Sequence, residues 1–374
     1  MKILHLLYES KGDYFGIGGV VTRAYSIYSY LRDRHDITLL CKKYPGANDG
    51  KIEGLKHIFV GTESKSLTKT LLSYAYNAAF FVKRYGKDFD VIIEEFSPAI
   101  PTFLNLYKKR PVVLQIQGYT GKKYFEKYNI LYSTTLYILE RLRPKYYKDI
   151  IVVSDITKRK FNFQKKGNIQ VISNGVPEEL LNIETGESDY ILYLGRIDIH
   201  NKGLDILLDA CSSFCRLIPE VKFVIAGDGR DREIFRGLVH KLPEEARKNI
   251  EMTGWVDGER KRSLLRDAIM VVIPSRYETQ GIVALEAMAY GKPIVASDIP
   301  ELSYIVNWGA GKAFNTGNAI SLAQAMKKLI MSNRREEMGE KGRERVKDYT
   351  WDRIASKYER FLEGIFDENS PTHL

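Results

Sequence analysis

The chain has 374 residues, 44% of them hydrophobic and 28% charged, which is long for one domain and sufficient for two with sizeable cores. A run of about 18 apolar residues is absent, which excludes a membrane-spanning helix. The short, charged stretch 1–9 is expected to be a strand rather than a signal peptide. Three cysteines exclude a disulfide framework and favour a reducing compartment. Cys211 and Cys215 share a predicted helix face with leucines, which favours a core role over a metal site.

Positive charge is concentrated in the first half of the chain. Residues 1–170 contain 29 Lys and Arg against 15 Asp and Glu, a net charge of +14, whereas the remainder contains 28 against 32, a net charge of −4. This asymmetry predicts an anionic partner for the first half, such as a membrane surface, a lipid phosphate or a nucleic acid.

Strand-like and helix-like segments alternate through the first half, in the order of a doubly wound parallel sheet. The apolar runs are short enough for buried strands, and amphipathic stretches separate them. The predicted strands are residues 3–7, 37–41, 57–60, 91–95, 111–116, 150–153 and 169–172, and the predicted helices include residues 20–31 and 66–85.

The second half repeats this alternation after the polar segment 177–189, which we interpret as a linker or hinge. Its predicted strands are residues 190–194, 221–226, 250–253, 269–273 and 293–296, and its predicted helices are residues 204–217, 231–240, 259–266 and 284–290.

The predicted fold class is therefore α/β, with two Rossmann-like doubly wound domains that face a cleft. Ligands of such sheets bind at the carboxyl ends of the strands, here at the cleft. The predicted domains are residues 1–172, residues 173–348, and a final segment 349–374 that contains a helix over 351–366 and a tail.

Two glutamates eight positions apart flank the start of a predicted helix. The apolar run 268–273 predicts a buried parallel strand that ends at Pro274. Glu278 lies in the loop that follows, and Glu286 lies about two turns into the next helix. Gly281 lies near the start of that helix, where free N–H groups and the positive end of the helix dipole favour an anion. Such a pair suits the hydroxyls of a sugar nucleotide, with its phosphates at the helix start.

Glycines accompany possible phosphate ligands after two other predicted strands. Arg196 and Lys202, each close to a glycine, suit a diphosphate that gains charge as its sugar leaves. A solvated basic loop is the alternative for these two residues. Gly18 and Gly19 lie between the first strand and the first helix, where the backbone can approach a phosphate closely. A tight strand-to-helix turn would look similar.

The stretch 274–289 resembles the E-x7-E signature of the retaining GT-B glycosyltransferases of family 4, which build glycans and glycolipids from sugar nucleotides. The likeness covers nearly the whole chain, because 195–203 resembles the family's G-R…K-G element and 111–118 resembles a family strand. It implies a GT-B fold in which the final helix crosses back to pack on the first domain. It also implies a donor held without a metal.

The resemblance implies a role for each matching residue. Arg196 and Lys202 are expected to bind the donor phosphates, Glu286 the ribose hydroxyls, and Glu278 the donor sugar. The remaining contacts implied by the resemblance are Gly18 and Gly19 with the diphosphate, the backbone of Gly281 and Ile282 with sugar or phosphate, and the loops of Gly227 and Gly254 beside the base.

The same residues could also have purely structural roles that involve no ligand. Glu286 could form a structural ion pair while Glu278 is solvated. Trp255, beside Gly254, could stack on a ligand or pack in the core, with equal weight. Tyr277 could lie near the donor or be a surface aromatic residue.

Two positions depart from the pattern of the family. Gln117 stands where the family strand usually ends in histidine. Glutamine can donate a hydrogen bond to a sugar hydroxyl or phosphate but cannot titrate near neutral pH, which puts acid–base chemistry at this position in doubt. Gln280 replaces a residue that is often aromatic, and we expect it to alter the sugar pocket. The candidate catalytic residues are Glu278, Arg196, Lys202 and Gln117.

No metal site is expected. The pair Asp88 and Asp90 looks like a metal-binding D-x-D motif, but it precedes a predicted strand, which favours a turn. The six histidines show no metal-ligand spacing. The expected cofactor is the nucleotide-sugar donor alone, UDP- or GDP-linked.

Two basic, aromatic stretches, 122–145 and 64–84, have the pattern of amphipathic surface helices. They could lie on an anionic membrane, or their aromatic residues could face the core; the family's lipid-carried acceptors slightly favour the membrane. The expected location is the cytoplasm, with peripheral association at the inner face of the membrane as an open possibility.

The resemblance therefore implies a retaining glycosyltransferase that moves a sugar from a nucleotide-diphosphate sugar to an acceptor hydroxyl, in glycolipid, polysaccharide or glycan synthesis. The expected partners are the donor and a sugar or lipid-linked acceptor. A sugar-nucleotide epimerase or hydrolase on the same fold is an alternative, but it needs an acid–base pair that the sequence does not show. A nucleic-acid binder would explain only the basic half.

Overall fold

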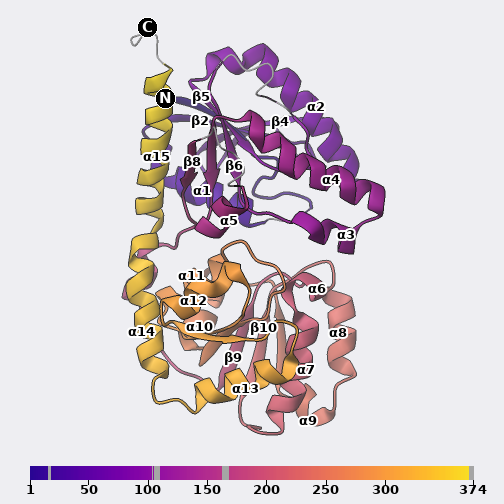
Figure 1. Cartoon of the computed structure of the whole chain (residues 1–374), viewed down its shortest axis with the longest axis vertical. Helices are drawn as coiled ribbons and strands as arrows, with labels where there is room; N and C mark the ends of the chain where they lie inside the picture. The colour runs from indigo at the N-terminus through magenta and orange to yellow at the C-terminus, as the bar shows by residue number, and fades with distance from the viewer. Residues whose placement is uncertain (16–17, 103, 105–109, 162–167, 370–374) are drawn as a thin grey trace. The chain divides into compact units, whose positions relative to one another are not determined.

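The computed structural model describes residues 1–15, 18–102, 104, 110–161 and 168–369. Its contacts divide the chain into two compact units, and each has the α/β architecture that the sequence predicts (Figure 1). The first unit contains residues 1–174 and 351–374, and the second contains residues 175–350. Within the described ranges, no helix has both the length and the hydropathy to cross a membrane.

The first unit is built on an eight-stranded sheet with the order β3-β4-β2-β1-β5-β6-β7-β8. Neighbouring strands are parallel except β3 and β4, which form an antiparallel hairpin that turns at Glu53 and Gly54, both with positive φ. The sequence did not predict β3, because its three residues show no apolar alternation. The strands are β1 Lys2–Leu6, β2 Asp36–Lys42, β3 Gly50–Ile52, β4 Leu55–Val60, β5 Val91–Glu95, β6 Val112–Ile116, β7 Asp149–Val152 and β8 Asn168–Val171.

Helices cover both faces of this sheet, because the side chains of buried strands alternate between the two. In β5, Ile93 packs in the core formed with α1 and α15, whereas Ile92 packs in the core formed with α2. The helices of the first unit are α1 Gly19–Leu31, α2 Leu67–Tyr85, α3 Tyr124–Lys127, α4 Ile130–Leu142, α5 Asp155–Lys160 and α15 Trp351–Glu368.

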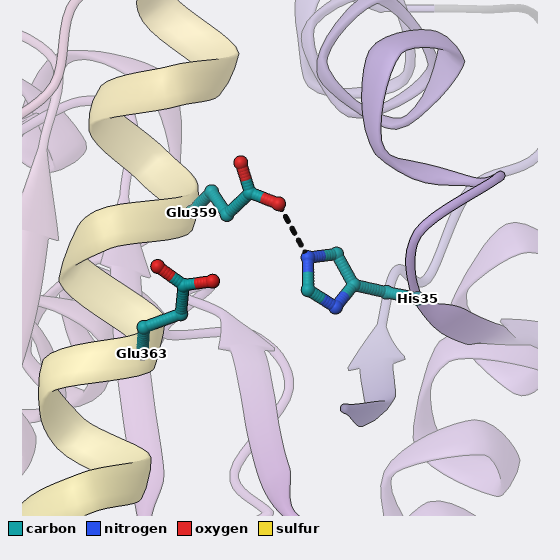
Figure 2. A group of neighbouring side chains, drawn as sticks. All are labelled: His35, Glu359 and Glu363. Carbon is teal, nitrogen blue, oxygen red and sulfur yellow. Dashed lines mark hydrogen bonds and ion pairs between the residues drawn. The ribbon is translucent and has the colours of Figure 1, made fainter.

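The last helix, α15, packs against α1, as the GT-B resemblance implies. Its apolar side chains, which include Trp351, Tyr358 and Leu362, are buried in the core under α1. At its edge Glu359 accepts a hydrogen bond from His35 Nε2 at 2.6 Å, and Figure 2 shows Glu363 one turn further along. The apolar stripe therefore carries the packing, and the hydrogen bond between His35 and Glu359 lies at its edge.

The second unit contains a six-stranded parallel sheet with the order β11-β10-β9-β12-β13-β14. Cys211 and Cys215 are buried in its core on α7, which confirms the core role predicted for them. The strand β14 was not predicted. The strands are β9 Tyr190–Leu194, β10 Lys222–Ala226, β11 Ile250–Gly254, β12 Met270–Ile273, β13 Ile294–Ser297 and β14 Gly311–Phe314. The helices are α6 Ile199–Lys202, α7 Leu204–Cys215, α8 Arg232–His240, α9 Glu244–Arg247, α10 Gly258–Asp267, α11 Ile282–Ala289, α12 Ser303–Asn307, α13 Ala319–Ile330 and α14 Arg335–Val346.

The polar segment 177–189, interpreted above as a linker or hinge, is fastened to the second unit. Lys292 Nζ donates to the carbonyl oxygen of Gly186 at 2.5 Å, and Arg335 pairs with Glu187 at 2.6 Å. The contact boundary between the units falls earlier, between Asn174 and Gly175. The backbone of the segment is bound there as well, because the amides of Gly186 and Ser188 donate to the carbonyl oxygens of Arg266 and Asp267.

Candidate active site

Loops from three adjacent strands meet at the carboxyl edge of the second sheet, where β10, β9 and β12 lie side by side. They approach so closely that only glycine fits at two points. A Cβ atom on Gly227 would lie 1.8 Å from the carbonyl oxygen of Gly195, and one on Gly203 would lie 2.0 Å from that of Pro274. Both glycines have positive φ, 143° and 64°, so the backbone conformation also requires them.

The loop after β12, which carries Glu278, is fastened to the α6–α7 corner. Arg276 forms a bidentate ion pair with Asp205, at 2.7 and 2.6 Å, and donates to the carbonyl oxygen of His200 at 3.0 Å. The amide of Arg276 also donates to the carbonyl oxygen of Asn201 at 3.0 Å. Bidentate Arg–carboxylate pairs are geometrically specific, so this contact sets the position of Glu278 relative to Lys202.

Glu278 and Lys202 meet directly. Lys202 Nζ lies 2.5 Å from Glu278 Oε1, and the buried Ser275 hydroxyl donates to the same oxygen at 3.0 Å. The Glu278 side chain is only 13% exposed. The solvated interpretation of Glu278 is therefore wrong, since this carboxylate holds the lysine expected to bind phosphate.

Arg196, at the end of β9, has an exposed side chain, and no carboxylate in the described ranges pairs with its guanidinium. The Arg196 backbone is held in place by the Tyr193 hydroxyl, which donates a hydrogen bond to the Arg196 carbonyl oxygen at 2.7 Å. Burial raises the pKa of Tyr193 well above its usual range, which keeps this hydroxyl protonated and donating. Within the described ranges, the two cations expected to bind phosphate therefore differ, because Arg196 has no carboxylate partner whereas Lys202 is paired with Glu278.

Glu286 is buried on α11, with one carboxylate oxygen paired and the other without a partner. Lys261 Nζ lies 2.6 Å from Oε1. Oε2 is buried and has no hydrogen-bond partner among the described residues, and the residue as a whole is 8% exposed. The structural ion pair expected for Glu286 is therefore present, but it engages only one of the two carboxylate oxygens. A buried unsatisfied carboxylate oxygen is unfavourable, and a ligand hydroxyl would satisfy it.

Lys261 is a site residue that sequence reasoning missed. It lies in α10, the helix that follows the Gly254 loop, 25 positions before Glu286. A single lysine in a charged helix carries no signal of its own, because five other charged residues lie in the same helix. Only the fold shows which of them reaches Glu286.

The turn into α11 has the geometry of an anion-binding helix start. Gly281 is its N-cap with φ 73°, and Ile282 is its first residue. The chain before it is fixed because the Tyr304 hydroxyl donates to the Gln280 carbonyl oxygen at 2.5 Å. No side chain caps this helix, which leaves its first N–H groups to other acceptors.

The β11 loop presents an aromatic side chain to solvent. Gly254 has φ 73°, and Trp255 beside it is 62% exposed. The core-packing interpretation of Trp255 is therefore wrong, and its indole remains available to stack on a ligand. Tyr277, beside Glu278, is half-buried.

Three of the predicted site residues belong to the first unit. Gly18 is the N-cap of α1 in an extended conformation, and Gly19 is its first helical residue. Gly16 and Ile17, earlier in the same loop, lie outside the described residues. Gln117 follows β6 and donates from Nε2 to Glu95 Oε1 at 3.1 Å.

Comparisons with known proteins agree with these motifs. The model described as Glycosyltransferase Family 4 matches residues 17–180, and the model described as Glycosyl transferases group 1 matches residues 182–345. A phosphatidyl-myo-inositol mannosyltransferase of Mycobacterium leprae is 31% identical over 298 residues, which cover 76% of this chain and 75% of the relative. The chain belongs to the family 4 glycosyltransferases. A glycosyltransferase activity follows for this enzyme.

Solved structures share the fold of this glycosyltransferase. Sucrose-phosphate synthase from Thermosynechococcus elongatus superposes with a TM-score of 0.82 at 21% identity, over 98% of this chain and 99% of the other. Anabaena HepE in complex with UDP and glucose has a TM-score of 0.75 at 17% identity, over 97% and 100%. The GT-B fold class predicted from the sequence is confirmed.

One group of possible metal ligands occurs among the described residues of the glycosyltransferase, although the sequence shows no such spacing. His35, Glu359 and Glu363 place ligand atoms within 4.8 Å of one another (Figure 2). Arg34 already pairs with Glu359 at 3.0 Å, and the terminal amine of Met1 lies 3.2 Å from His35 Nδ1. A metal-binding histidine turns that second nitrogen towards an acceptor, so these contacts suit an ion-pair network better than a cation.

The Asp88 and Asp90 pair has a structural role in the first unit, as predicted. Asp88 ends a short 3-10 turn. Asp90 Oδ2 accepts a hydrogen bond from the Lys2 amide at 2.7 Å, which links the turn to the start of β1.

Proposed function

We propose that this glycosyltransferase moves a sugar from a UDP- or GDP-linked donor to an acceptor hydroxyl, with retention at the anomeric carbon. The observation that carries the proposal is the unpartnered, buried Glu286 Oε2. An ionised carboxylate only accepts hydrogen bonds, and a ribose diol supplies two adjacent O–H donors. Lys261 offsets the charge on the other oxygen, so the carboxylate remains ready for the diol.

The donor diphosphate is assigned to Arg196, Lys202 and the start of α11. The proposed cations lie at the carboxyl edge of β9, where anionic ligands of parallel sheets bind. Gly281 and Ile282 supply backbone N–H groups, and Gly18 and Gly19 are proposed to do the same from α1. In this proposal fixed protein charges, and no metal, stabilise the charge that develops on the leaving group.

The proposed reaction breaks the bond between the anomeric carbon and the phosphate oxygen, and forms a bond to the acceptor oxygen on the same face. The acceptor proton passes to the departing phosphate. Glu278 orients the donor sugar and holds Lys202 at the leaving group through its 2.5 Å pair. Gln117 is assigned to the donor sugar. Electrostatic preorganisation of this kind is worth several kcal/mol.

We propose further that the acceptor is carried on a lipid. The Mycobacterium leprae relative is named a phosphatidyl-myo-inositol mannosyltransferase, and phosphatidyl-myo-inositol is a lipid. In this chain an apolar surface patch, the α3–α4 patch, is exposed on the basic first unit. Ile130 and Leu131, in the first turn of α4, are 77% and 79% exposed, and Lys122 is exposed beside α3. Apolar side chains amid lysines suit an anionic bilayer surface. The patch comprises Phe125, Tyr128, Ile130, Leu131 and Tyr132.

The proposal is tested by product analysis. The enzyme is incubated with UDP-glucose, UDP-galactose, UDP-N-acetylglucosamine or GDP-mannose and with phosphatidylinositol vesicles, and the anomeric configuration of the product is determined by NMR. Since these donors are α-linked, an α-linked glycolipid supports retention and a lipid acceptor. A β-linked product contradicts the retaining mechanism, and release of free sugar alone contradicts transfer.

A further inference from the structure

A groove with a volume of about 390 Å³ lies at the outer edge of the second sheet, beside the terminal strand β14. Its walls come from β14, from α13 and from Val306 of α12, so the second unit forms it alone. Sites for small ligands have volumes of roughly 300–1,000 Å³, so this volume is sufficient for one. The strand β13 separates β14 from β12, whose loop carries Glu278, and no lining residue belongs to the candidate active site. We name this feature the β14 groove.

The charged side chains that line the β14 groove are both cations. Lys312 belongs to β14 and Lys328 to α13, and no aspartate or glutamate lines the groove. Among the described residues, no carboxylate pairs with either ammonium group, whereas several other lysines of the second unit form ion pairs. These paired lysines are Lys202, Lys222, Lys261, Lys341 and Lys347. The groove therefore holds two positive charges that the protein does not compensate.

This positive charge is a local feature of one segment. Residues 302–333, which include α12, β14 and α13, contain three lysines and no arginine, aspartate or glutamate. The second unit as a whole, residues 175–350, contains 25 Lys and Arg against 27 Asp and Glu, a net charge of −2. A cationic groove in a unit of slightly negative net charge favours a bound anion over general attraction to the protein.

Uncharged donors accompany the two lysines. The Ser321 hydroxyl oxygen accepts a hydrogen bond from the Asn315 amide at 3.0 Å, which leaves the hydroxyl hydrogen free to be donated. Gln324 is exposed on the wall of the groove, and its side-chain amide makes no hydrogen bond within the described ranges. Both side chains can therefore donate to an anion between the lysines.

The open edge of β14 supplies a further donor. The carbonyl oxygens of Ala310 and Phe314 accept hydrogen bonds from β13 at 3.1 and 3.0 Å. Because a parallel strand turns alternate residues towards its neighbour, Ala313 directs its N–H and C=O groups to the opposite, unpaired side. Ala313 is exposed and lines the groove, so its N–H group is accessible to a ligand.

We propose that the β14 groove binds a phosphate monoester. Such an ester carries a charge of about −1.5 to −2 near pH 7 and three acceptor oxygens, which match two lysines and several neutral donors. A carboxylate offers a single charge and two oxygens, and a neutral sugar does not use the lysines. The proposed site is separate from the donor site, so a phosphorylated ligand there would bind in addition to the nucleotide sugar.

The first test is lysine acetylation of the whole enzyme, followed by mass spectrometry. We expect glycerol 3-phosphate at millimolar concentration to slow acetylation of Lys312 and Lys328 by about threefold or more, because an ammonium bound to phosphate is masked. The exposed Lys241, which lies outside the groove, should react at an unchanged rate. Glycerol is the neutral control, and equal protection by glycerol and glycerol 3-phosphate would overturn the proposal.

The same ester occurs on small metabolites and as the headgroup of phosphatidic acid. Protection by glycerol 3-phosphate in solution identifies a metabolite site, and protection by vesicles of phosphatidic acid alone identifies a lipid headgroup. Both results support a site for a phosphate monoester. No protection of the two lysines by either probe would overturn the proposal.

The second test uses charge-removing variants and calorimetry with glycerol 3-phosphate. We expect Lys312→Gln combined with Lys328→Gln to weaken binding of this ester by about tenfold, because two charge-assisted contacts are lost at a solvent-accessible site. The matched control is Lys327→Gln, which removes the same charge from the neighbouring position of α13 outside the groove. Equal weakening by the control would show unspecific attraction, and no weakening by the double variant would place the ester elsewhere; either result contradicts the proposal.

Discussion

Lys202 and Glu278 form an ion pair of 2.5 Å between the α6 corner and the loop after β12. The pair joins the cation assigned to the leaving phosphate to the carboxylate assigned to the sugar. A diphosphate that binds Lys202 must share it with Glu278, and Arg276 with Asp205 keeps the two loops in register while this happens. In the proposed reaction, Glu278 would therefore compete with the ground-state phosphate for Lys202 and support the geometry of the transition state.

Replacing Glu278 should therefore separate binding from turnover. For Glu278→Gln we expect nucleoside diphosphate affinity to stay constant or rise by a factor of about two to five, because Lys202 loses its competing partner. Transfer should fall by about 100-fold, because the sugar loses its orienting carboxylate. Calorimetry measures the nucleoside diphosphate affinity, and initial rates measure the transfer reaction. The exposed Glu220→Gln serves as control and should change neither, and an unchanged rate in Glu278→Gln would refute its assigned role.

Gly203 should be intolerant of any side chain. Alanine there meets the carbonyl oxygen of Pro274 at 2.0 Å and also a φ of 64°, so the β12 loop must move. We expect Gly203→Ala to lower the free energy of unfolding of the second unit by about 2–4 kcal/mol and to abolish nucleotide binding. Gly317→Ala is the matched control, because φ is 84° there and a Cβ meets nothing within 4 Å. Urea unfolding measures the stability of the two variants, and calorimetry measures their nucleotide binding. Equal losses in Gly203→Ala and Gly317→Ala would show that backbone strain alone, and not the contact with Pro274, is responsible.

Lys292 should make stability depend on pH in the alkaline range. Burial lowers its pKa to about 8, whereas an unfolded lysine titrates near 10.4. Between these values the unfolded chain binds more protons than the folded one, so this group makes stability rise with pH. The stability of the enzyme relative to Lys292→Met should thus increase by about 2 kcal/mol from pH 7.5 to pH 10. The exposed Lys222→Met should show no such trend, and a flat difference for Lys292→Met would contradict the burial effect.

The α3–α4 patch should bind anionic membranes. Serine at both Ile130 and Leu131 removes two exposed apolar side chains without touching the core. We expect about tenfold weaker binding to phosphatidylglycerol-containing vesicles, and little binding of either protein to pure phosphatidylcholine. Co-sedimentation measures both. Ile234→Ser, a change at a 63% exposed residue of the second unit, is the control. Undiminished binding of the double variant would place the membrane surface elsewhere.

Local pattern was sufficient for most elements of the fold. The apolar run before Pro274 identified β12, and the glycine and glutamates after it identified the turn into α11. The helix α13 escaped prediction, as did two edge strands: β3 has three residues, and β14 mixes exposed with buried positions. Their strand character comes from pairing with a neighbour, which a window along the chain does not contain.

Pairings across the fold were not readable from the sequence. The motif indicated Glu286 but not Lys261, and the family strand indicated Gln117 but not the carboxylate of Glu95 that accepts its hydrogen bond. His35 and Glu359 are separated by 324 positions, so no spacing rule connects them. Sequence patterns thus located the strand ends that bear the chemistry, whereas the partners of each side chain depend on tertiary packing.

The most direct test of the central claim is calorimetric titration of the enzyme and of Glu286→Ala with UDP, GDP and ADP, in the presence of EDTA. The account predicts that one nucleotide binds without metal, and that Glu286→Ala weakens it by about 10- to 100-fold through loss of the hydroxyl contacts. The exposed Glu251→Ala should bind as the enzyme does. Equal affinity of the enzyme and Glu286→Ala, or no binding of any nucleotide, would contradict the assignment of Glu286 to the donor ribose.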